Sequence, residues 1–332
     1  MAKTHKRLME RAADFENLSH AFRQAVCGHR RQAQASRMFF NLESDLLRLR
    51  EELLSGSYRF GRYQSFVIHD PKSRTIKAAP FRDRVVHHAV CNVIEPIFDR
   101  GFIYDSYACR TGKGTMQGVL RLHAWVKGDP GAYVLHCDIA KYFNSVDHDV
   151  LLGLLARRIA DKRLLALLAD LVTGGASSPG KGIPIGNLTS QLFANIYLDP
   201  LDHFVKERSR VRHYIRYVDD FLCLGSDKDC LWKEKEEIEG VLNRLKLSFH
   251  PKKARVYPVK TGVPFLGVLV SPGGIRILGE RLERSVRGQR EALEAWRRGE
   301  IGEERYLASL ESRIAHAEMF GDGRLARKLG WA

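Results

Sequence analysis

The sequence of 332 residues contains no apolar run long enough to cross a membrane. Its longest stretch without a charged residue, Ile183 to Leu198, is interrupted by Pro184, Gly186 and several polar side chains. A membrane-spanning helix needs about 20 mostly apolar residues. The basic residues near the N-terminus are followed by no apolar segment, so we expect no secretory signal. These absences predict a protein without a membrane partner.

Cysteine is scarce and shows no pattern. The six cysteines stand at positions 27, 91, 109, 137, 223 and 230, and none forms a Cys-x-x-Cys pair. This spacing provides neither a disulfide framework nor a zinc site, so we expect a reducing, cytoplasmic compartment. No period of 20 to 50 residues repeats and no stretch is low in complexity, which excludes a solenoid.

Positive charge, in contrast, is abundant. Lys and Arg number 54 against 39 Asp and Glu, a net charge of +15, and 44% of the residues are hydrophobic. The apolar content is too high for a disordered chain and suffices for one large unit or a few small ones. The charge predicts a polyanionic partner such as nucleic acid. On charge alone, a soluble protein with a solvated basic surface is the alternative.

Hydrophobic periodicity predicts an α+β fold. Helical patterns occupy 8–55, as two helices ending near Gly56, then 82–99, 115–127, 147–160, 162–173, a stretch beginning near Leu188, 231–247, and the region from 280 onward. Strand patterns occupy 58–68 and 74–79, as a hairpin, then 132–138, 213–218, 221–225, 254–258 and 264–270.

Three acidic residues stand where such strands end. Asp138 closes the run 132–138, and Asp219-Asp220 lies between two apolar arms, which predicts a β-hairpin with paired acids at its bend. Carboxylates so placed can converge on Mg²⁺, which takes few protein ligands and keeps phosphate oxygens in its shell. Two such ions about 4 Å apart would activate a 3′-hydroxyl and stabilise a leaving pyrophosphate. Considered alone, an Asp-Asp pair is more often a simple turn.

The order of neighbouring motifs supports the metal interpretation. Tyr217-Val218-Asp219-Asp220 resembles the signature of reverse transcriptases, and the segment from Cys137 to Phe143 resembles their first catalytic motif. Further blocks follow the order of that family: 71–74 and 79–86 in the fingers, 182–186 in the palm loop, 247–253, and 265–267. The resemblance covers roughly residues 57 to 270.

This resemblance implies a right-hand polymerase: a helical N-terminal lead (1–56), fingers (57–130), a palm with an antiparallel sheet (131–270) and a helical thumb (271–332). The activity implied is RNA-directed DNA synthesis from deoxynucleoside triphosphates. Asp138 and Asp219 would ligate two Mg²⁺ ions, with Mn²⁺ as a substitute. Ile139 would lend its carbonyl, and Asp220 would assist.

The same resemblance implies residues that contact the nucleotide. Lys72 and Arg74 would grip the triphosphate, since phosphates favour Arg forks and Lys point charges. The alternative for these two residues is a solvated basic turn. Phe143 would close off the sugar 2′ position, and the alternative for it is an ordinary core aromatic. Lys253 would protonate the pyrophosphate. The palm loop would contribute Ile185, Gly186 and Gln191.

The C-terminal region shows a two-sided pattern. Leu282, Val286, Leu293 and Trp296 share one helix face. Arginine recurs every three residues, at Arg281, Arg284, Arg287 and Arg290. We therefore expect one side to pack and these arginines to bind nucleic acid.

The palm loop indicates a subtype. Ile185-Gly186-Asn187-Leu188-Thr189-Ser190-Gln191 resembles diversity-generating retroelement enzymes, whereas group II intron enzymes carry Gln-Gly there and end the motif in Ser-Pro. An apolar Ile185 discriminates substrates by only about 1 to 3 kcal/mol, which predicts loose selection. The subtype implies error-prone copying at template adenines, a structured template RNA with its cDNA, a small basic oligomeric accessory protein, and a bacterial, archaeal or phage origin.

Two other interpretations stay open. The first is another prokaryotic reverse transcriptase, of the retron, abortive-infection, defence or group II intron type. The second is an RNA-binding module without catalytic activity, although all three acids are present.

Overall fold

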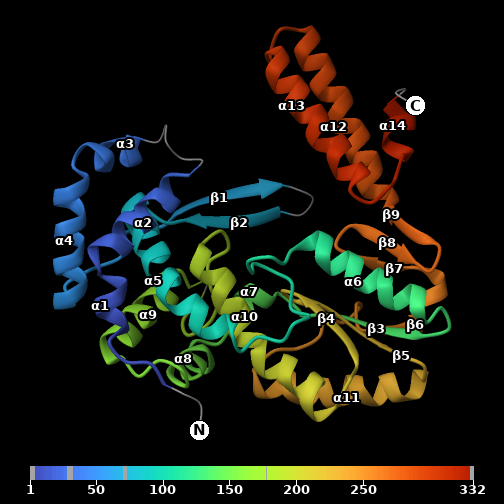
Figure 1. Ribbon diagram of the computed structural model, residues 1–332, viewed down its shortest axis with the longest axis horizontal. Helices are drawn as coiled ribbons and strands as arrows, with labels where there is room; N and C mark the ends of the chain where they lie inside the picture. The colour runs from blue at the N-terminus through green and yellow to red at the C-terminus, as the bar shows by residue number, and fades with distance from the viewer. Residues whose placement is uncertain (1–3, 28–32, 70–72, 177, 330–332) are drawn as a thin grey trace.

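An antiparallel four-stranded sheet lies at the centre of the molecule (Figure 1). The computed structural model describes residues 4–27, 33–69, 73–176 and 178–329. The strand order is β4-β5-β3-β6, with bounds β3 Tyr133–Asp138, β4 His213–Tyr217, β5 Asp220–Gly225 and β6 Arg255–Pro258. The α+β prediction is confirmed.

Alternation along these strands supplies two hydrophobic cores. Leu135, Cys137, Tyr214 and Phe221 belong to the larger core, whereas Val134, Ile215 and Leu222 belong to the smaller. Successive side chains in a strand point to opposite faces, so both faces of the sheet are covered. Helix α11 (Lys228–Arg244) packs on the first face, and α6 (Thr115–Gly128) contacts β4 on the second.

Helices surround the larger core. Their bounds are α1 Leu8–Ala12, α2 Phe15–Val26, α3 Ala33–Phe40, α4 Leu42–Ser55, α5 Phe81–Asp99, α7 Tyr142–Ser145, α8 His148–Ala156, α9 Lys162–Gly174 and α10 Leu188–His203, which a π-helical turn, Phe204–Arg208, continues. The prediction of two N-terminal helices is wrong in number, since the described residues within 8–55 form four helices. Asp14 stands between α1 and α2. Its side chain caps the N-terminus of α2 by accepting hydrogen bonds from the Glu16 and Asn17 N–H groups.

A two-stranded hairpin projects over the centre of the molecule. Strand β1 (Gln64–His69) pairs with β2 (Ser73–Ala78), in register from Gln64 opposite Ala78 to His69 opposite Ser73. The hairpin prediction is confirmed, with the first strand starting later than expected. The predicted triphosphate contact Lys72 lies outside the described residues.

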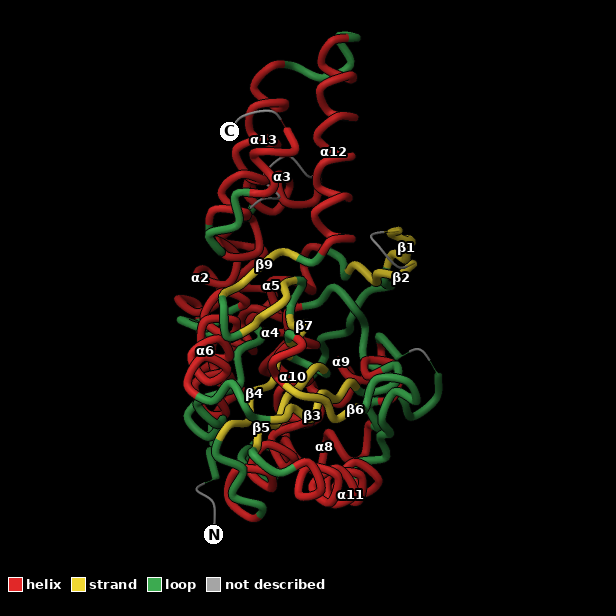
Figure 2. Tube along the Cα trace, turned by 90° about the vertical axis from the view of Figure 1, so that its right-hand side faces the viewer, coloured by secondary structure: helices red, strands yellow, loops and turns green. Residues whose placement is uncertain are grey.

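The C-terminal part combines a small sheet with helices. Strands β7 (Val263–Phe265), β8 (Val268–Ser271) and β9 (Gly274–Ile277) form an antiparallel sheet after a 3-10 turn, Val259–Thr261. The single strand predicted over 264–270 is wrong, because Leu266 and Gly267 both have positive φ (51° and 89°) and reverse the chain. Helices α12 (Gly279–Arg297), α13 (Glu303–Glu318) and α14 (Arg324–Leu329) follow, and Figures 1 and 2 show α12 and α13 extending beyond the sheets. None of the described helices is both long and apolar enough to cross a bilayer.

Candidate active site

Strand pairing brings the three acids together at one end of the central sheet. Asp138, the last residue of β3, lies opposite Asp220, the first residue of β5. The Ile139 N–H donates to the Asp219 carbonyl at 3.2 Å, which ties the hairpin turn to the end of β3. We call Asp138, Asp219 and Asp220 the acid cluster.

Two basic side chains contact this cluster. Lys253 forms an ion pair with Asp138, while the His136 Nε2 atom lies 2.8 Å from Asp220 Oδ1. The other ring nitrogen of His136 lies 3.1 Å from the Tyr257 hydroxyl. His136 is therefore held from both sides, and it fixes the Asp220 carboxylate at the edge of the cluster.

Asp219 differs from its two neighbours. Burial, together with the negative charges of Asp138 and Asp220, raises its pKa to about 6, and the positive charge of Lys253 opposes the shift. A carboxylate withdrawn from water beside two like charges is unfavourable unless a cation neutralises it. The Asp219 site is thus electrostatically suited to a positive ligand.

The donor set fits a hard divalent cation that also binds substrate. In the described parts of the chain, no group of three or more His, Cys, Asp or Glu side chains has the arrangement to hold a metal by itself. Carboxylate oxygens are nevertheless the ligands that Mg²⁺ prefers, and it fills the rest of its shell with water and phosphate oxygens. Asp138 and Asp219 would be its protein ligands once Lys253 moved away from Asp138, and the His136 contact would keep Asp220 at the side.

A cleft of about 1,020 Å³ opens beside the cluster. Its lining includes Asp138, Asp220, Trp232, Lys253, Arg255 and Tyr257. The side chain of Lys253 is 42% exposed, so its ammonium group is open to solvent. Such a channel can hold an anionic chain next to the acids.

The palm loop is fastened to the hairpin β1–β2. The Lys77 N–H donates to the Ile185 carbonyl at 3.1 Å, and Gly186 has a φ of 110°. A Cβ at Gly186 would lie 2.8 Å from Ile76 Cγ2, so glycine is required by both conformation and space. The side chain of Ile185 stays half-buried, and Gln191, on the first turn of α10, is exposed.

Two further predicted nucleotide contacts occupy different surroundings. Arg74 is exposed on β2, opposite Ile68. Phe143 is half-buried against the larger core, with its ring edge-on to Tyr142 at 5.6 Å. Its carbonyl accepts from the Ile183 N–H at 2.8 Å, which joins it to the palm loop. Phe143 therefore has both a packing role and an open side.

The predicted arginine row on α12 is not uniform. Arg281 is half-buried and donates through Nη1 to the Leu266 carbonyl at 3.0 Å. A Cβ at Gly267 would lie 1.9 Å from that same Nη1, which explains glycine at this position. Arg284, Arg287 and Arg290 are exposed. Arg281 thus joins the small sheet to α12, and the other three present charge to solvent.

Sequence reasoning missed His136 and Arg216. His136 precedes Asp138 by two residues, and this spacing places both on the same face of a strand. Arg216 stands in the apolar run 213–218, where a charged residue signals a buried partner. Both signals were present in the sequence.

Comparison with known proteins agrees with this architecture. A family profile described as reverse transcriptase (RNA-dependent DNA polymerase) matches residues 69–270. Protein YkfC of Escherichia coli (strain K12) is 29% identical over 272 residues, covering 68% of this chain and 71% of that protein. The group II intron-encoded protein LtrA of Lactococcus lactis subsp. cremoris is 22% identical over 294 residues, covering 67% and 49%.

The match spans more than half of the chain, so this chain belongs to the reverse transcriptase family and is an RNA-directed DNA polymerase. It spans about half the length of LtrA and about a third of a Saccharomyces cerevisiae protein, the putative COX1/OXI3 intron 1 protein. A solved structure of apo telomerase from Candida tropicalis aligns with a TM-score of 0.48 at 13% identity, over 64% of this chain and 48% of that one.

Proposed function

We propose that the acid cluster carries out two-metal nucleotidyl transfer, extending a DNA strand on an RNA template. The supporting observation is the convergence of Asp138, Asp219 and Asp220 beside an open basic cleft. Two Mg²⁺ ions, for which Mn²⁺ can substitute, would supply an activated 3′-hydroxyl and stabilise charge on the pyrophosphate. Asp138 and Asp219 would hold them, with the Ile139 carbonyl as a further ligand.

The residues around the acid cluster would orient its carboxylates and neutralise part of their charge. His136 keeps Asp220 at the side of the cluster, where it adds negative charge without occupying the centre. Lys253 places its ammonium against Asp138 and would donate a proton to the leaving pyrophosphate. At neutral pH Asp219, with a pKa of about 6, is mostly ionised and able to bind a cation.

The incoming nucleotide would lie between the hairpin and the palm loop. Arg74 and Lys72 would bind its triphosphate, and Phe143 would exclude a 2′-hydroxyl. Ile185, Gly186 and Gln191 would line the base and sugar side. The bond from Lys77 to the Ile185 carbonyl supports this arrangement, because it couples the two elements that would meet the nucleotide.

The template RNA and its cDNA would follow the basic face of the molecule. Under this proposal residues 57–130 form the fingers, 131–270 the palm, 271–332 the thumb and 1–56 a helical lead. The exposed Arg284, Arg287 and Arg290 on α12 would contact phosphates. Arg281 would mainly join palm and thumb.

The subtype we propose is a diversity-generating retroelement enzyme. The apolar Ile185 in the palm loop supports it, and the subtype brings error-prone copying at template adenines and a small basic oligomeric accessory protein. Changing Ile185 to Gln and sequencing the cDNA tests this: the proposal expects fewer errors at template adenines. An unchanged error spectrum would remove the loop from the explanation.

A group II intron type is the second candidate function. The similarity to LtrA and to proteins named for introns favours it. The two candidates differ in their template. A neighbouring repeat that differs from a target gene at adenines supports the retroelement, whereas an intron around the coding region supports the alternative.

Primer extension tests the proposed chemistry. Purified protein, an RNA template and a DNA primer should give DNA products with each complementary dNTP in the presence of Mg²⁺. No product should form with EDTA, and ribonucleotides should be poor substrates. Extension that continues in the presence of EDTA would contradict two-metal transfer.

A further inference from the structure

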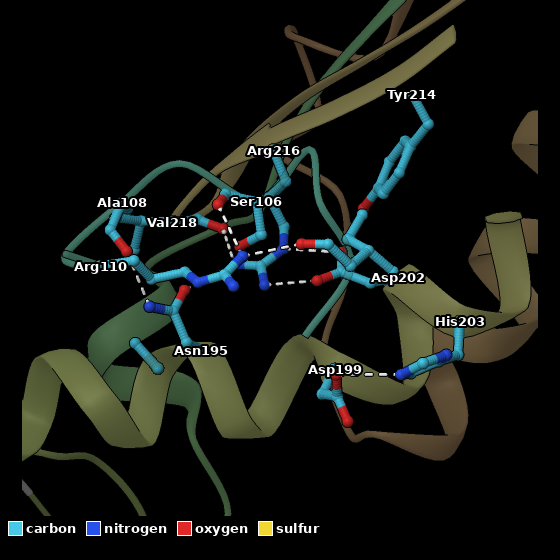
Figure 3. Close-up of polar contacts among 12 residues, drawn as sticks. Ser106, Ala108, Arg110, Asn195, Asp199, Asp202, His203, Tyr214, Arg216 and Val218 are labelled. Atoms are coloured by element: carbon cyan, nitrogen blue, oxygen red, sulfur yellow. Dashed lines mark hydrogen bonds and ion pairs between the residues drawn. The ribbon is translucent and has the colours of Figure 1, made fainter. Parts of the chain in front are cut away.

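Arg216 on β4 forms a two-pronged ion pair with Asp202 on α10 (Figure 3). Its Nε atom donates to Asp202 Oδ1 at 2.7 Å and its Nη2 atom to Oδ2 at 2.5 Å. Both side chains are completely buried, at 0% exposure. The Tyr214 hydroxyl also donates to Asp202 Oδ1, at 2.7 Å. The charge of Arg216 is therefore fully matched by these contacts.

The remaining arm of the guanidinium reaches the turn that carries the acids. Nη1 of Arg216 donates to the Val218 carbonyl at 3.1 Å and to Asn195 Oδ1 at 3.2 Å. Asn195 is itself fixed, since its Nδ2 atom donates to the Ala108 carbonyl at 2.8 Å. One guanidinium thus joins the long helix α10 to the residue that precedes Asp219.

Val218 has a backbone conformation that needs such support. Its φ is 57°, in the left-handed region that β-branched residues rarely adopt. Unfavourable conformations of this kind persist only where the surroundings hold them. The next carbonyl, that of Asp219, accepts from Ile139 N–H at 3.2 Å. The Val218 and Asp219 carbonyls are therefore both anchored, the first to Arg216 and the second to Ile139, which follows β3.

We propose that Arg216 is a positioning residue, which sets the direction of the Asp219 carboxylate by holding the Val218 carbonyl against α10. This inference rests on the proposed function of the acid cluster. An ion pair that served only stability would be complete with the two prongs to Asp202. The third arm extends past that pair to the one turn residue with strained geometry.

A lysine substitution separates the two roles. In Arg216→Lys, a single ammonium can pair with Asp202 but lacks the fork that also reaches the Val218 carbonyl. The matched control is Tyr214→Phe, which removes another bond to the same Asp202 oxygen and leaves the turn untouched. Both variants disturb the same buried acid.

Kinetics and metal binding are then measured on both full-length variants. For Arg216→Lys we expect kcat to fall roughly 10- to 100-fold with little change in the KM for dNTP. Binding of Mn²⁺, followed by electron paramagnetic resonance with template and primer present, should weaken by about 10-fold or more. Tyr214→Phe should keep both values near those of the parent protein, even if its melting temperature falls.

The outcomes are distinct. Normal kcat and Mn²⁺ binding in Arg216→Lys would overturn the inference, as would equal losses in Tyr214→Phe. If Arg216→Lys does not fold, the double variant with Asp202→Glu restores a buried pair by lengthening the acid, and the same losses are expected. Asp219→Asn is run alongside: if it stays active, the proposed function fails, whereas an inactive Asp219→Asn beside a normal Arg216→Lys removes only the positioning role.

Discussion

The two faces of the central sheet carry charged groups at the same end, but the charges are balanced on one face and unbalanced on the other. On one face Arg216 and Asp202 are completely buried and match each other with two hydrogen bonds. At the turn and on the other face, the acid cluster places Asp219 beside two like charges, and its pKa rises to about 6. The two sites are joined through Val218.

This difference separates a structural ion pair from a ligand site. A matched pair requires nothing further, and removing one partner leaves a buried charge without compensation. An excess of carboxylates, in contrast, costs stability in the free protein and is relieved when a cation binds. An unbalanced group of charges is therefore a better indicator of a ligand site than a balanced ion pair is.

The largest expected effect comes from Asp219→Asn. Primer extension should fall by roughly 10³-fold, since the amide cannot replace a charged metal ligand. Because the folded-state pKa of Asp219 is raised, its ionised form destabilises the fold at pH values above about 6. In metal-free buffer at pH 8 the variant should thus melt at a higher temperature than the parent protein. Lost activity together with lower stability would contradict this interpretation.

Asp202→Asn should have the opposite effect on the stability of the fold. Neutralising Asp202 strands the buried Arg216 guanidinium, so the free energy of unfolding should fall by about 3–5 kcal/mol in urea titrations. The pair of Arg48 and Glu52, at 3.2 Å, provides the control, because the Arg48 side chain is 78% exposed. Arg48→Ala should cost no more than about 1 kcal/mol. Equal losses in the two variants would remove the distinction between matched burial and surface pairing.

Lys253 tests whether a basic residue in contact with the acid cluster takes part in the reaction. Lys253→Ala should lower kcat by about 10²-fold if this ammonium acts as general acid, with little change in stability because the side chain is 42% exposed. Lys252→Ala, one residue away, is the matched control and should keep its kcat. A loss confined to KM would instead indicate that Lys253 only binds substrate.

Asp322 extends the comparison to a third acid, near the C-terminus. The Arg324 side chain, with the Ile277 N–H, lowers its pKa to about 2. Since this value lies below that of an unfolded chain, the ionised acid stabilises the fold above about pH 4, and the contribution is lost as pH falls toward 2. Asp322→Asn should cost about 1–2 kcal/mol at pH 7, an effect that shrinks at pH 3.5. A pH-independent difference would contradict this linkage.

The sequence predicted the elements of the candidate site well, because their signals are local. Apolar runs ending in acids indicated β3 and the β4–β5 hairpin, and the structure then shows Asp138 opposite Asp220. Neighbouring motifs indicated the family. The roles assigned to individual residues stay predictions, which the variants above test.

Features that depend on distant contacts could not be predicted. The partner of Arg216 lies on another element, and no local pattern pairs Asp202 with it. At Ile185, reasoning from the side chain missed that its carbonyl is bonded to Lys77. Leu266 has positive φ although a leucine gives no sequence signal for it, so periodicity predicts one strand where the chain reverses within 264–270.

Under the proposed function, Asp138 and Asp219 hold the divalent ions of polymerisation. The most direct measurement is a crystal of the protein with RNA template, DNA primer, a non-hydrolysable dNTP and Mn²⁺, examined by anomalous scattering at the manganese edge. We expect two peaks that both contact the Asp138 and Asp219 carboxylates, with Asp220 beside them. Peaks located elsewhere, or a nucleotide bound with no metal at these acids, would contradict it.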